Sequence, residues 1–301
     1  MIYTVTFSPA IDYVVDLDEL KIGAINRSKK ETSLPGGKGI NVSIVLSNLG
    51  KKSVATGFLG GYTGEYIKKE LQDKHIDCGF ISVEGNTRIN VKIRGKEETA
   101  INGQGPHIDD EQIESLMNQL EKLTSNDLLV ISGTIPSTLP SDMYERILER
   151  IKNNHVELIV DATNDILLNT LKYHPLLVKP NQEELEEMFG VKIKNTADLI
   201  ENASKLISKG AKNVIVSLGG DGALLVGENI SPLLLPAPKG KVVNTVGAGD
   251  SLVAGFIDEY LNSKDIAKAF RRGIATGSAS AFSEGLATKE EVEALLNKMD
   301  A

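Results

Sequence analysis

The sequence predicts an α/β fold with three layers, α/β/α, around a mostly parallel central sheet, and a small β-sheet lid beside it. From about residue 109 to 218, short apolar runs alternate with stretches of helical periodicity. This alternation is typical of a parallel sheet covered by helices on both faces. Residues 11–34 and 86–104 interrupt it with polar, β-rich arms. We expect these two segments to form a discontinuous lid on a single domain spanning residues 1–301.

Composition and charge exclude several classes of protein. The formal net charge of the 301 residues is −8, so a broad attraction to nucleic acid or to an anionic membrane is not expected. Cys78 is the only cysteine, which rules out an intramolecular disulfide. No apolar run approaches the length of a membrane span, and the N-terminus lacks the pattern of a signal peptide. We therefore expect a cytoplasmic protein.

The N-terminal half opens with a strand over residues 1–9, because apolar and polar residues alternate there. After the first lid segment, a glycine-rich turn opens a helix that ends at Gly50. A strand, a helix and a strand follow, and the second lid segment has the pattern of a hairpin around Gly95 and Lys96. We place these three elements at 53–60, 64–74 and 78–84.

The rest of the chain alternates more regularly. We expect strands at 127–132, 157–162, 175–180 and 213–218. We expect helices at about 109–122, 140–153, 164–172, 181–189 and 196–209. Residues 222–243 are typical of antiparallel strands at the sheet edge, and the tail predicts helices at about 248–261, 264–282 and 288–297.

A glycine turn near the C-terminus is the first candidate site. Lys241 to Thr245 predicts a short strand, Gly247-Ala248-Gly249 a tight turn, and an apolar-periodic helix begins near Asp250. Glycines let backbone N–H groups approach a ligand, and a helix N-terminus adds partial positive charge, so the turn is a candidate anion hole. Asp250 would lie beside it, as a general base for phosphoryl transfer requires. Alternatively, Asp250 is only a helix cap and the glycines only a turn.

A second glycine turn, Leu34 to Asn41, opens the first long helix. It lacks the Lys-Ser/Thr pair of a P-loop and the GxGxxG spacing of a dinucleotide fold, so both common nucleotide motifs are absent. Polar motifs nevertheless follow the predicted strands, and ligands of open α/β sheets bind at that edge. These motifs are Asp12, Ser132 to Thr134, Asp161, Lys179 to Glu184, Ser217 to Gly222, and Gly247 to Asp250.

Two of these segments carry a family resemblance. GGKGINV at 36–42 and NTVGAGDSLVAGF at 244–256 resemble the hallmark motifs of the ribokinase-like (PfkB) carbohydrate kinase family. The likeness extends along the whole chain, and within the family it is greatest to the kinases of ketohexose phosphates. It implies the ribokinase-like fold, ATP and Mg²⁺ as cofactors, and transfer of phosphate to the 6-hydroxyl of fructose 1-phosphate.

The resemblance also implies roles for single residues. Asp250 would be the base, and the backbone of Gly247, Ala248 and Gly249 would stabilise the transferring phosphoryl group. The sugar would be bound by Asp12, Gly36, Gly37, Asn41, Asn90 and Thr134. Its phosphate would meet Lys38, Arg88, Lys92 and Arg27, the last from the lid of a partner subunit. The nucleotide would be bound by Lys179, Asn181, Glu184, Ser217, Gly219, Gly222 and Thr245, with Glu184 acting on magnesium through water.

Alternatives remain open at this point. Tagatose 6-phosphate or fructose 6-phosphate would present a 1-hydroxyl to Asp250 and its 6-phosphate to the same cations. A non-catalytic sugar-phosphate sensor is a third reading. An exposed lid with one apolar face predicts a homodimer formed through the lid. Some relatives hold a monovalent cation such as K⁺ in the loop that corresponds to 283–286, and this sequence leaves that open.

Overall fold

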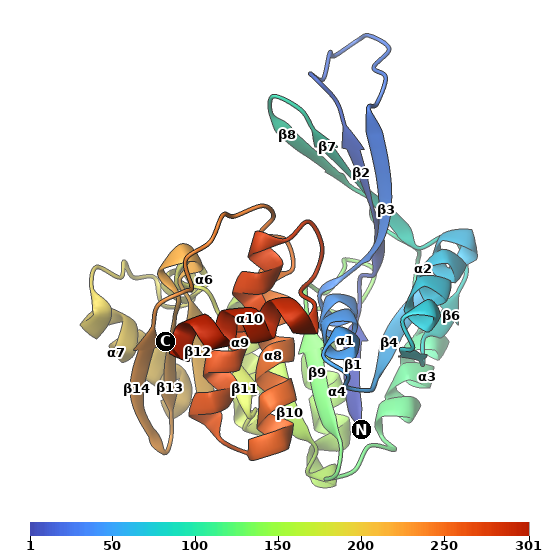
Figure 1. The fold of residues 1–301 in the computed structure, drawn as a ribbon. Coiled ribbons are helices and arrows are strands. Elements are labelled where there is room, and N and C mark those ends of the chain that lie inside the picture. The colour runs from blue at the N-terminus through green and yellow to red at the C-terminus, as the bar shows by residue number, and fades with distance from the viewer. Residues whose placement is uncertain (301) are drawn as a thin grey trace.

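The computed structural model describes residues 1–300 and contains two β-sheets (Figure 1). The ten-stranded sheet has the order β14-β13-β12-β11-β10-β9-β1-β4-β5, and β6 also pairs with β4. Its pairs are parallel except β12 with β13 and β13 with β14. The strands are β1 Ile2–Thr6, β4 Ser53–Gly60, β5 Asp77–Cys78, β6 Ile81–Val83, β9 Leu128–Ser132, β10 Glu157–Asp161, β11 Leu177–Val178, β12 Asn213–Ser217, β13 Ala223–Gly227 and β14 Ile230–Leu235.

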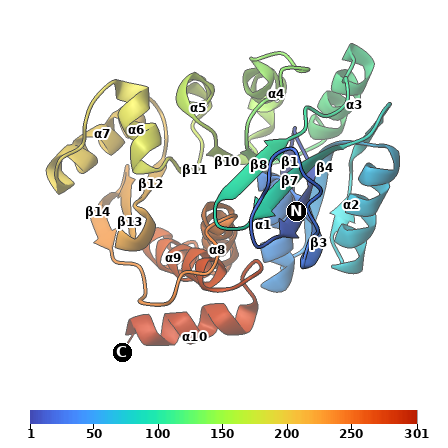
Figure 2. The same ribbon diagram turned by 90° about the horizontal axis from the view of Figure 1, so that it is seen from above.

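Helices cover both faces of this sheet, so the predicted three-layer class is confirmed (Figure 2). The helices on one face are α3 Asp110–Leu120, α4 Met143–Ile151, α5 Asn164–Thr170, α6 Gln182–Phe189 and α7 Thr196–Ser208. The other face carries α1 Lys38–Asn48, α8 Ala248–Ser263, α9 Ile266–Phe282 and α10 Lys289–Asp300. Helix α2, Gly61–Asp73, packs beside α1, and short 3₁₀ turns lie at Lys152–Asn154, Leu171–Tyr173 and Gly219–Asp221.

Each face of the sheet has its own hydrophobic core. Leu116, Ile147 and Leu185 are fully buried on the α3 to α7 side. Phe256 and Phe270 are fully buried on the opposite side. Burial of an apolar side chain of this size stabilises the fold by about 1.5–3 kcal/mol. The strand ends between these cores are therefore held on a rigid frame.

The second sheet is the predicted lid, and it rises from the carboxyl edge of the large sheet (Figure 1). Strand β2 pairs antiparallel with β3 and parallel with β7, and β7 pairs antiparallel with β8. Alternate residues give it one apolar face, and Ile101 on that face is 60% exposed. The strands are β2 Ala10–Asp16, β3 Lys30–Gly36, β7 Arg88–Arg94 and β8 Glu98–Asn102.

One predicted strand is wrong. Residues 241–245 form an exposed loop, in which Val242 is 57% and Val243 50% exposed. The N–H groups of Val243 and Asn244 both donate to the carbonyl of Ala281 at the end of α9. Because the neighbouring element is a helix end, this β-branched run has no strand with which to pair.

Helix lengths bear on membrane association. Among residues 1–300, we find no helix with both the length and the apolar character that a bilayer crossing requires.

Candidate active site

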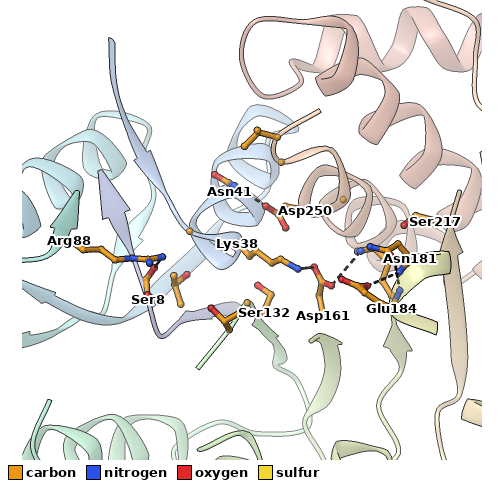
Figure 3. Close-up of a pocket in the computed structure, with 18 residues that line it drawn as sticks. Ser8, Lys38, Asn41, Arg88, Ser132, Asp161, Asn181, Glu184, Ser217 and Asp250 are labelled. Carbon is orange, nitrogen blue, oxygen red and sulfur yellow. Dashed lines mark hydrogen bonds and ion pairs between the residues drawn. The ribbon is translucent and has the colours of Figure 1, made fainter. Parts of the chain in front are cut away.

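A cavity of about 470 Å³ opens at the carboxyl ends of the central strands, below the lid (Figure 3). Its walls come from the ends of β1, β9 and β10 and from the first turns of α1, α6 and α8. The residues that line it are Thr6, Ser8, Gly37, Lys38, Asn41, Arg88, Ser132, Gly133, Thr134, Asp161, Lys179, Asn181, Glu184, Ser217, Val246, Gly247, Gly249 and Asp250.

The first turn of α8 places a buried carboxylate in this cavity. Gly247 caps the helix at φ 78°, and a Cβ there would lie 2.7 Å from Cδ2 of Leu286, so the turn requires glycine. Asp250 is 5% exposed, and its Oδ2 accepts a 2.8 Å hydrogen bond from Nδ2 of Asn41. The N–H of Ala248 is engaged within the turn, because it donates to the Thr245 carbonyl at 3.2 Å.

The surroundings of Asp250 adjust its affinity for a proton. Burial raises the pKa of Asp250 to about 6, and the negative charge of Asp161 adds to this rise. The hydrogen bond from Asn41 and the charges of Lys38 and Lys179 act in the opposite direction. A base whose pKa lies near the working pH suits proton transfer in catalysis.

Two lysines flank a buried aspartate on the floor of the cavity. Nζ of Lys38 lies 3.3 Å from Oδ2 of Asp161, and Nζ of Lys179 lies 3.4 Å from Oδ1. Burial lowers the pKa of Lys38, but the charges of Asp161, Asp250 and Glu184 outweigh it and raise that pKa. The Lys38 ammonium therefore stays charged at neutral pH, as binding of phosphate groups requires.

Arg88 occupies the lid side of the same cavity. Its guanidinium donates to the carbonyls of Ser8 at 3.0 Å and Gly103 at 3.3 Å, while its buried Nε has no hydrogen-bond partner. Burial lowers the pKa of Arg88, opposed by the charge of Asp12. Asp12 in turn accepts a 3.0 Å hydrogen bond from Asn90. The guanidinium is fixed in direction and keeps an unused donor.

A second cavity, of about 510 Å³, adjoins the first on the other side of the α8 N-terminus. Asn181, Ser217 and Gly249 line both cavities. Its remaining lining is mostly apolar or glycine, which suits a flat, uncharged ring system. These residues are Gly219, Gly220, Gly222, Ala237, Pro238, Lys239, Gly240, Val242, Thr245, Ala248, Leu252, Ile274, Gly277, Ser278, Ala281 and Phe282.

Glu184 lines the first cavity next to Asn181, which lines both cavities. It forms a capping box with Asn181: its Oε2 accepts from the Asn181 N–H at 2.8 Å, and its own N–H donates to Asn181 Oδ1 at 2.7 Å. Within residues 1–300 there is no cluster of three His, Cys, Asp or Glu ligands. One carboxylate with waters and substrate phosphates is a usual environment for Mg²⁺, so the residues present fit this ion.

The structure brings most predicted residues together at one site. The proposed base, the glycine turns and the nucleotide residues all line one of the two cavities, and Asp12, Gly36 and Asn90 lie just behind Arg88. Arg27 and Lys92 lie on the lid, and neither is among the described residues that line the two cavities. Lys92 donates a hydrogen bond to Asn102.

Four polar residues of the cavity have no individual role predicted from the sequence, although two of them, Ser132 and Asp161, belong to the polar motifs expected at the strand ends. Thr6, Ser132 and Asp161 are at most 3% exposed, and each has a buried side-chain oxygen without a hydrogen-bond partner. Each is the last residue of its strand, so the rule that ligands bind at strand ends indicates Ser132 and Asp161 and could have found Thr6 as well. Ser8, two residues beyond β1, is the fourth.

The first cavity, lined by Lys38, Lys179 and Arg88, is called the cationic cavity, and the second the apolar or nucleotide cavity. A buried carboxylate, Asp250, between these two cavities on a three-layer α/β/α frame fits a kinase-like phosphotransferase site. The chain matches the family model for the pfkB family of carbohydrate kinases over residues 5–293 and belongs to that family.

Individual relatives match over nearly the whole chain. The 1-phosphofructokinase of Bacillus subtilis (strain 168) is 46% identical over 98% of this chain and 97% of its own length. The D-tagatose-1-phosphate kinase of Bacillus licheniformis is 39% identical over 95% and 94%. The structure of phosphofructokinase-2 from Escherichia coli in complex with fructose-6-phosphate superimposes with a TM-score of 0.92 at 26% identity, covering 100% of this chain and 99% of that one.

Proposed function

We propose that this protein transfers the γ-phosphoryl group of ATP to the 6-hydroxyl of fructose 1-phosphate, giving fructose 1,6-bisphosphate and ADP. The meeting of the two cavities at Gly249, next to Asp250, carries the proposal. A phosphoryl group leaving a nucleotide in the apolar cavity would enter the cationic cavity beside the base. The relatives named 1-phosphofructokinase, at 46% and 40% identity, support the choice of substrate.

Asp250 is the general base in this mechanism. The sugar hydroxyl oxygen attacks the γ-phosphorus, its proton passes to the Asp250 carboxylate, and the bond to the ADP oxygen breaks. The N-terminus of α8, with the amides of Gly247 and Gly249, stabilises the charge that spreads over the phosphoryl oxygens. Lys38 and Lys179 neutralise the same charge from the cavity floor.

Substrate recognition divides between the lid base and the helix turns. Arg88 and Lys38 bind the phosphate that the sugar already carries, since an arginine fork and a lysine point charge suit it. The sugar hydroxyls are held by Asp12, Gly36, Gly37, Asn41, Asn90 and Thr134. Lys92 and Arg27 contribute from the lid, with Arg27 acting on the site of a partner subunit in a lid-to-lid dimer.

The nucleotide occupies the apolar cavity. Its phosphates meet Lys179, Asn181, Ser217, Gly219, Gly222 and Thr245. Glu184 would hold Mg²⁺ through water, and the ion would supply charge neutralisation between the phosphates. One relative's structure is a complex with potassium, so we extend the proposal to a K⁺ ion in the loop 283–286. We extend the proposal to a cytoplasmic location, where ATP and sugar phosphates are available.

The substrate is tested by ADP release with magnesium and ATP. We compare kcat/KM for fructose 1-phosphate, tagatose 1-phosphate, fructose 6-phosphate, tagatose 6-phosphate and fructose. A preference for fructose 1-phosphate over the others supports the proposal. Preference for a 6-phosphate would keep the fold and the base but reverse the sugar, and sugar-phosphate binding without turnover would indicate a sensor.

Tagatose 1-phosphate is the second candidate substrate. Two relatives named D-tagatose-1-phosphate kinase are 39% and 34% identical over at least 94% of both chains. Tagatose 1-phosphate differs from fructose 1-phosphate only in the configuration at C4, and it would present the same 6-hydroxyl to Asp250. A higher kcat/KM for this sugar in the same assay would select it.

A further inference from the structure

A buried tyrosine behind the wall of the cationic cavity holds that wall by its hydroxyl. Tyr144 lies in the first turn of α4 and is 1% exposed. Its Oη donates a 2.7 Å hydrogen bond to the carbonyl of Gly133. Burial raises the pKa of Tyr144 well above its ordinary value, and the charge of Asp161 adds to this. The phenol therefore keeps its proton and remains a donor at any working pH.

Gly133 is fixed at both of its backbone polar groups. Its N–H donates to the Asp161 carbonyl at 3.0 Å, and its carbonyl accepts from Tyr144. Its φ is +101°, a conformation that side-chain-bearing residues rarely adopt. Ser132, Gly133 and Thr134 all line the cavity, so the two bonds decide where this segment of wall lies. The bond from Tyr144 is the one that comes from outside the sheet.

The ring of Tyr144 also reaches a second segment of the site. It packs against Phe7, with ring centroids 5.4 Å apart and planes tilted by 57°. Phe7 is 2% exposed and precedes Ser8, whose carbonyl accepts a hydrogen bond from the guanidinium of Arg88. One rigid aromatic pair thus lies beneath both the Arg88 support and the Gly133 wall. Removing only the hydroxyl would disturb the wall and leave the ring pair in place.

We propose that Tyr144 is a positioning residue for the sugar phosphate, acting through the Gly133 carbonyl to place Thr134 against the substrate. Tyr144 is not among the described residues that line the cationic cavity, so it acts without touching substrate. The proposal rests on the proposed function of the cationic cavity as the sugar-phosphate site. The proposal predicts that nucleotide binding does not depend on Tyr144, because residues 132–134 are not among the described residues that line the nucleotide cavity.

The test compares Tyr144→Phe with Tyr260→Phe. Tyr260 is 8% exposed and donates a hydrogen bond of the same length, 2.7 Å, to Glu157. It lies towards the far end of α8 from Asp250, so it is a matched control for the loss of one buried phenol bond. Loss of such a bond weakens the placement it supports by about fivefold. We expect the KM for fructose 1-phosphate to rise by about that factor in Tyr144→Phe only, with the KM for ATP unchanged.

Amide hydrogen exchange across residues 132–135 gives a readout that needs no turnover. Exchange at Gly133 should quicken in Tyr144→Phe and not in Tyr260→Phe. An unchanged sugar-phosphate KM in active Tyr144→Phe, or an equal rise in both variants, overturns the proposal. If the unmodified enzyme turns over no sugar phosphate, the proposed function fails, and unchanged exchange at Gly133 would separately refute the positioning role.

Discussion

The side-chain amide of Asn41 donates to the carboxylate of Asp250 across 2.8 Å. Asn41 lies in the first turn of α1 and Asp250 in the first turn of α8, so this bond joins the two glycine turns of the sequence. It orients the carboxylate and also favours its charged form. The proposed base, the proposed sugar contact Asn41 and the proposed anion hole are thereby held as one unit.

The pH dependence of the reaction follows from the surroundings of Asp250. Its pKa is raised to about 6, and a general base acts only when it has lost its proton. We therefore expect kcat/KM for fructose 1-phosphate to fall as the pH drops through about 6 and to be flat above it. A profile measured from pH 4.5 to 8 checks this, and an acid limb near pH 4 would contradict the burial argument.

Replacing Asn41 distinguishes the titration of Asp250 from the titration of the substrate phosphate in that profile. A phosphate monoester also titrates near pH 6, with a second pKa of about 6. The Asn41 hydrogen bond lowers the pKa of Asp250, so Asn41→Ala should move the acid limb to higher pH while the substrate's own titration stays fixed. An unmoved midpoint would assign the limb to the substrate. Loss of a sugar contact should raise the KM in the same variant.

Asp250 should also lower the stability of the protein at neutral pH. Its folded-state pKa lies above its ordinary value, so the native state binds the proton more tightly than the unfolded state does. The contribution of Asp250 to the free energy of unfolding therefore decreases as the pH rises from about 4 to about 6. Asp250→Asn removes the buried charge, and we expect its Tm at pH 7.5 without ligands to rise by a few degrees.

Asp258→Asn is the control for that measurement. Asp258 lies in the same helix and is 3% exposed, but it pairs with Arg272 at 2.5 Å and Lys51 at 3.5 Å. Breaking a buried pair leaves a charge uncompensated, so this variant should melt at a lower temperature. A fall in Tm for both variants would mean that the charge of Asp250 is well compensated in the free protein.

Arg88 should act on the phosphate of the sugar. Arg88→Lys keeps a positive charge but loses the planar fork and the bonds to the Ser8 and Gly103 carbonyls. We expect kcat/KM for fructose 1-phosphate to fall by about 10- to 100-fold, the loss expected for one or two charge-assisted hydrogen bonds. Initial rates with fructose should change little, because that sugar carries no phosphate.

Lys92→Ala provides the comparison for Arg88. Lys92 lies on the exposed lid and donates to Asn102, so its removal should cost much less than that of Arg88. An effect of Lys92→Ala as large as that of Arg88→Lys would indicate that the lid closes further over the sugar than the structure shows.

Local sequence patterns were enough to predict most of the frame. Strand β4 has the expected bounds, 53–60, and helix α6 begins one residue after the expected start at 181. Alternation of period 2 and capping residues act over a few positions, which is why such elements can be predicted from sequence. The run at 241–245 failed because its outcome depends on a distant partner, and the end of α9 supplied no strand.

The ion network was beyond the reach of sequence patterns for the same reason. Asp161 ends β10, while its partner Lys38 lies 123 residues earlier, at the start of α1. Only the order of the strands brings the two side chains within 3.3 Å. The resemblance implies roles for Lys92 and Arg27, and both lie on the lid in the structure, so their roles stay predictions.

The role of Asp250 as the base is the central claim, and turnover by Asp250→Asn tests it most directly. We would measure ADP formation at saturating ATP and fructose 1-phosphate, together with the sugar-phosphate Kd by calorimetry. The account predicts that turnover falls by about 10²- to 10⁴-fold, the usual contribution of a general base, while the Kd stays within a few-fold. Turnover close to that of the unmodified enzyme would contradict it.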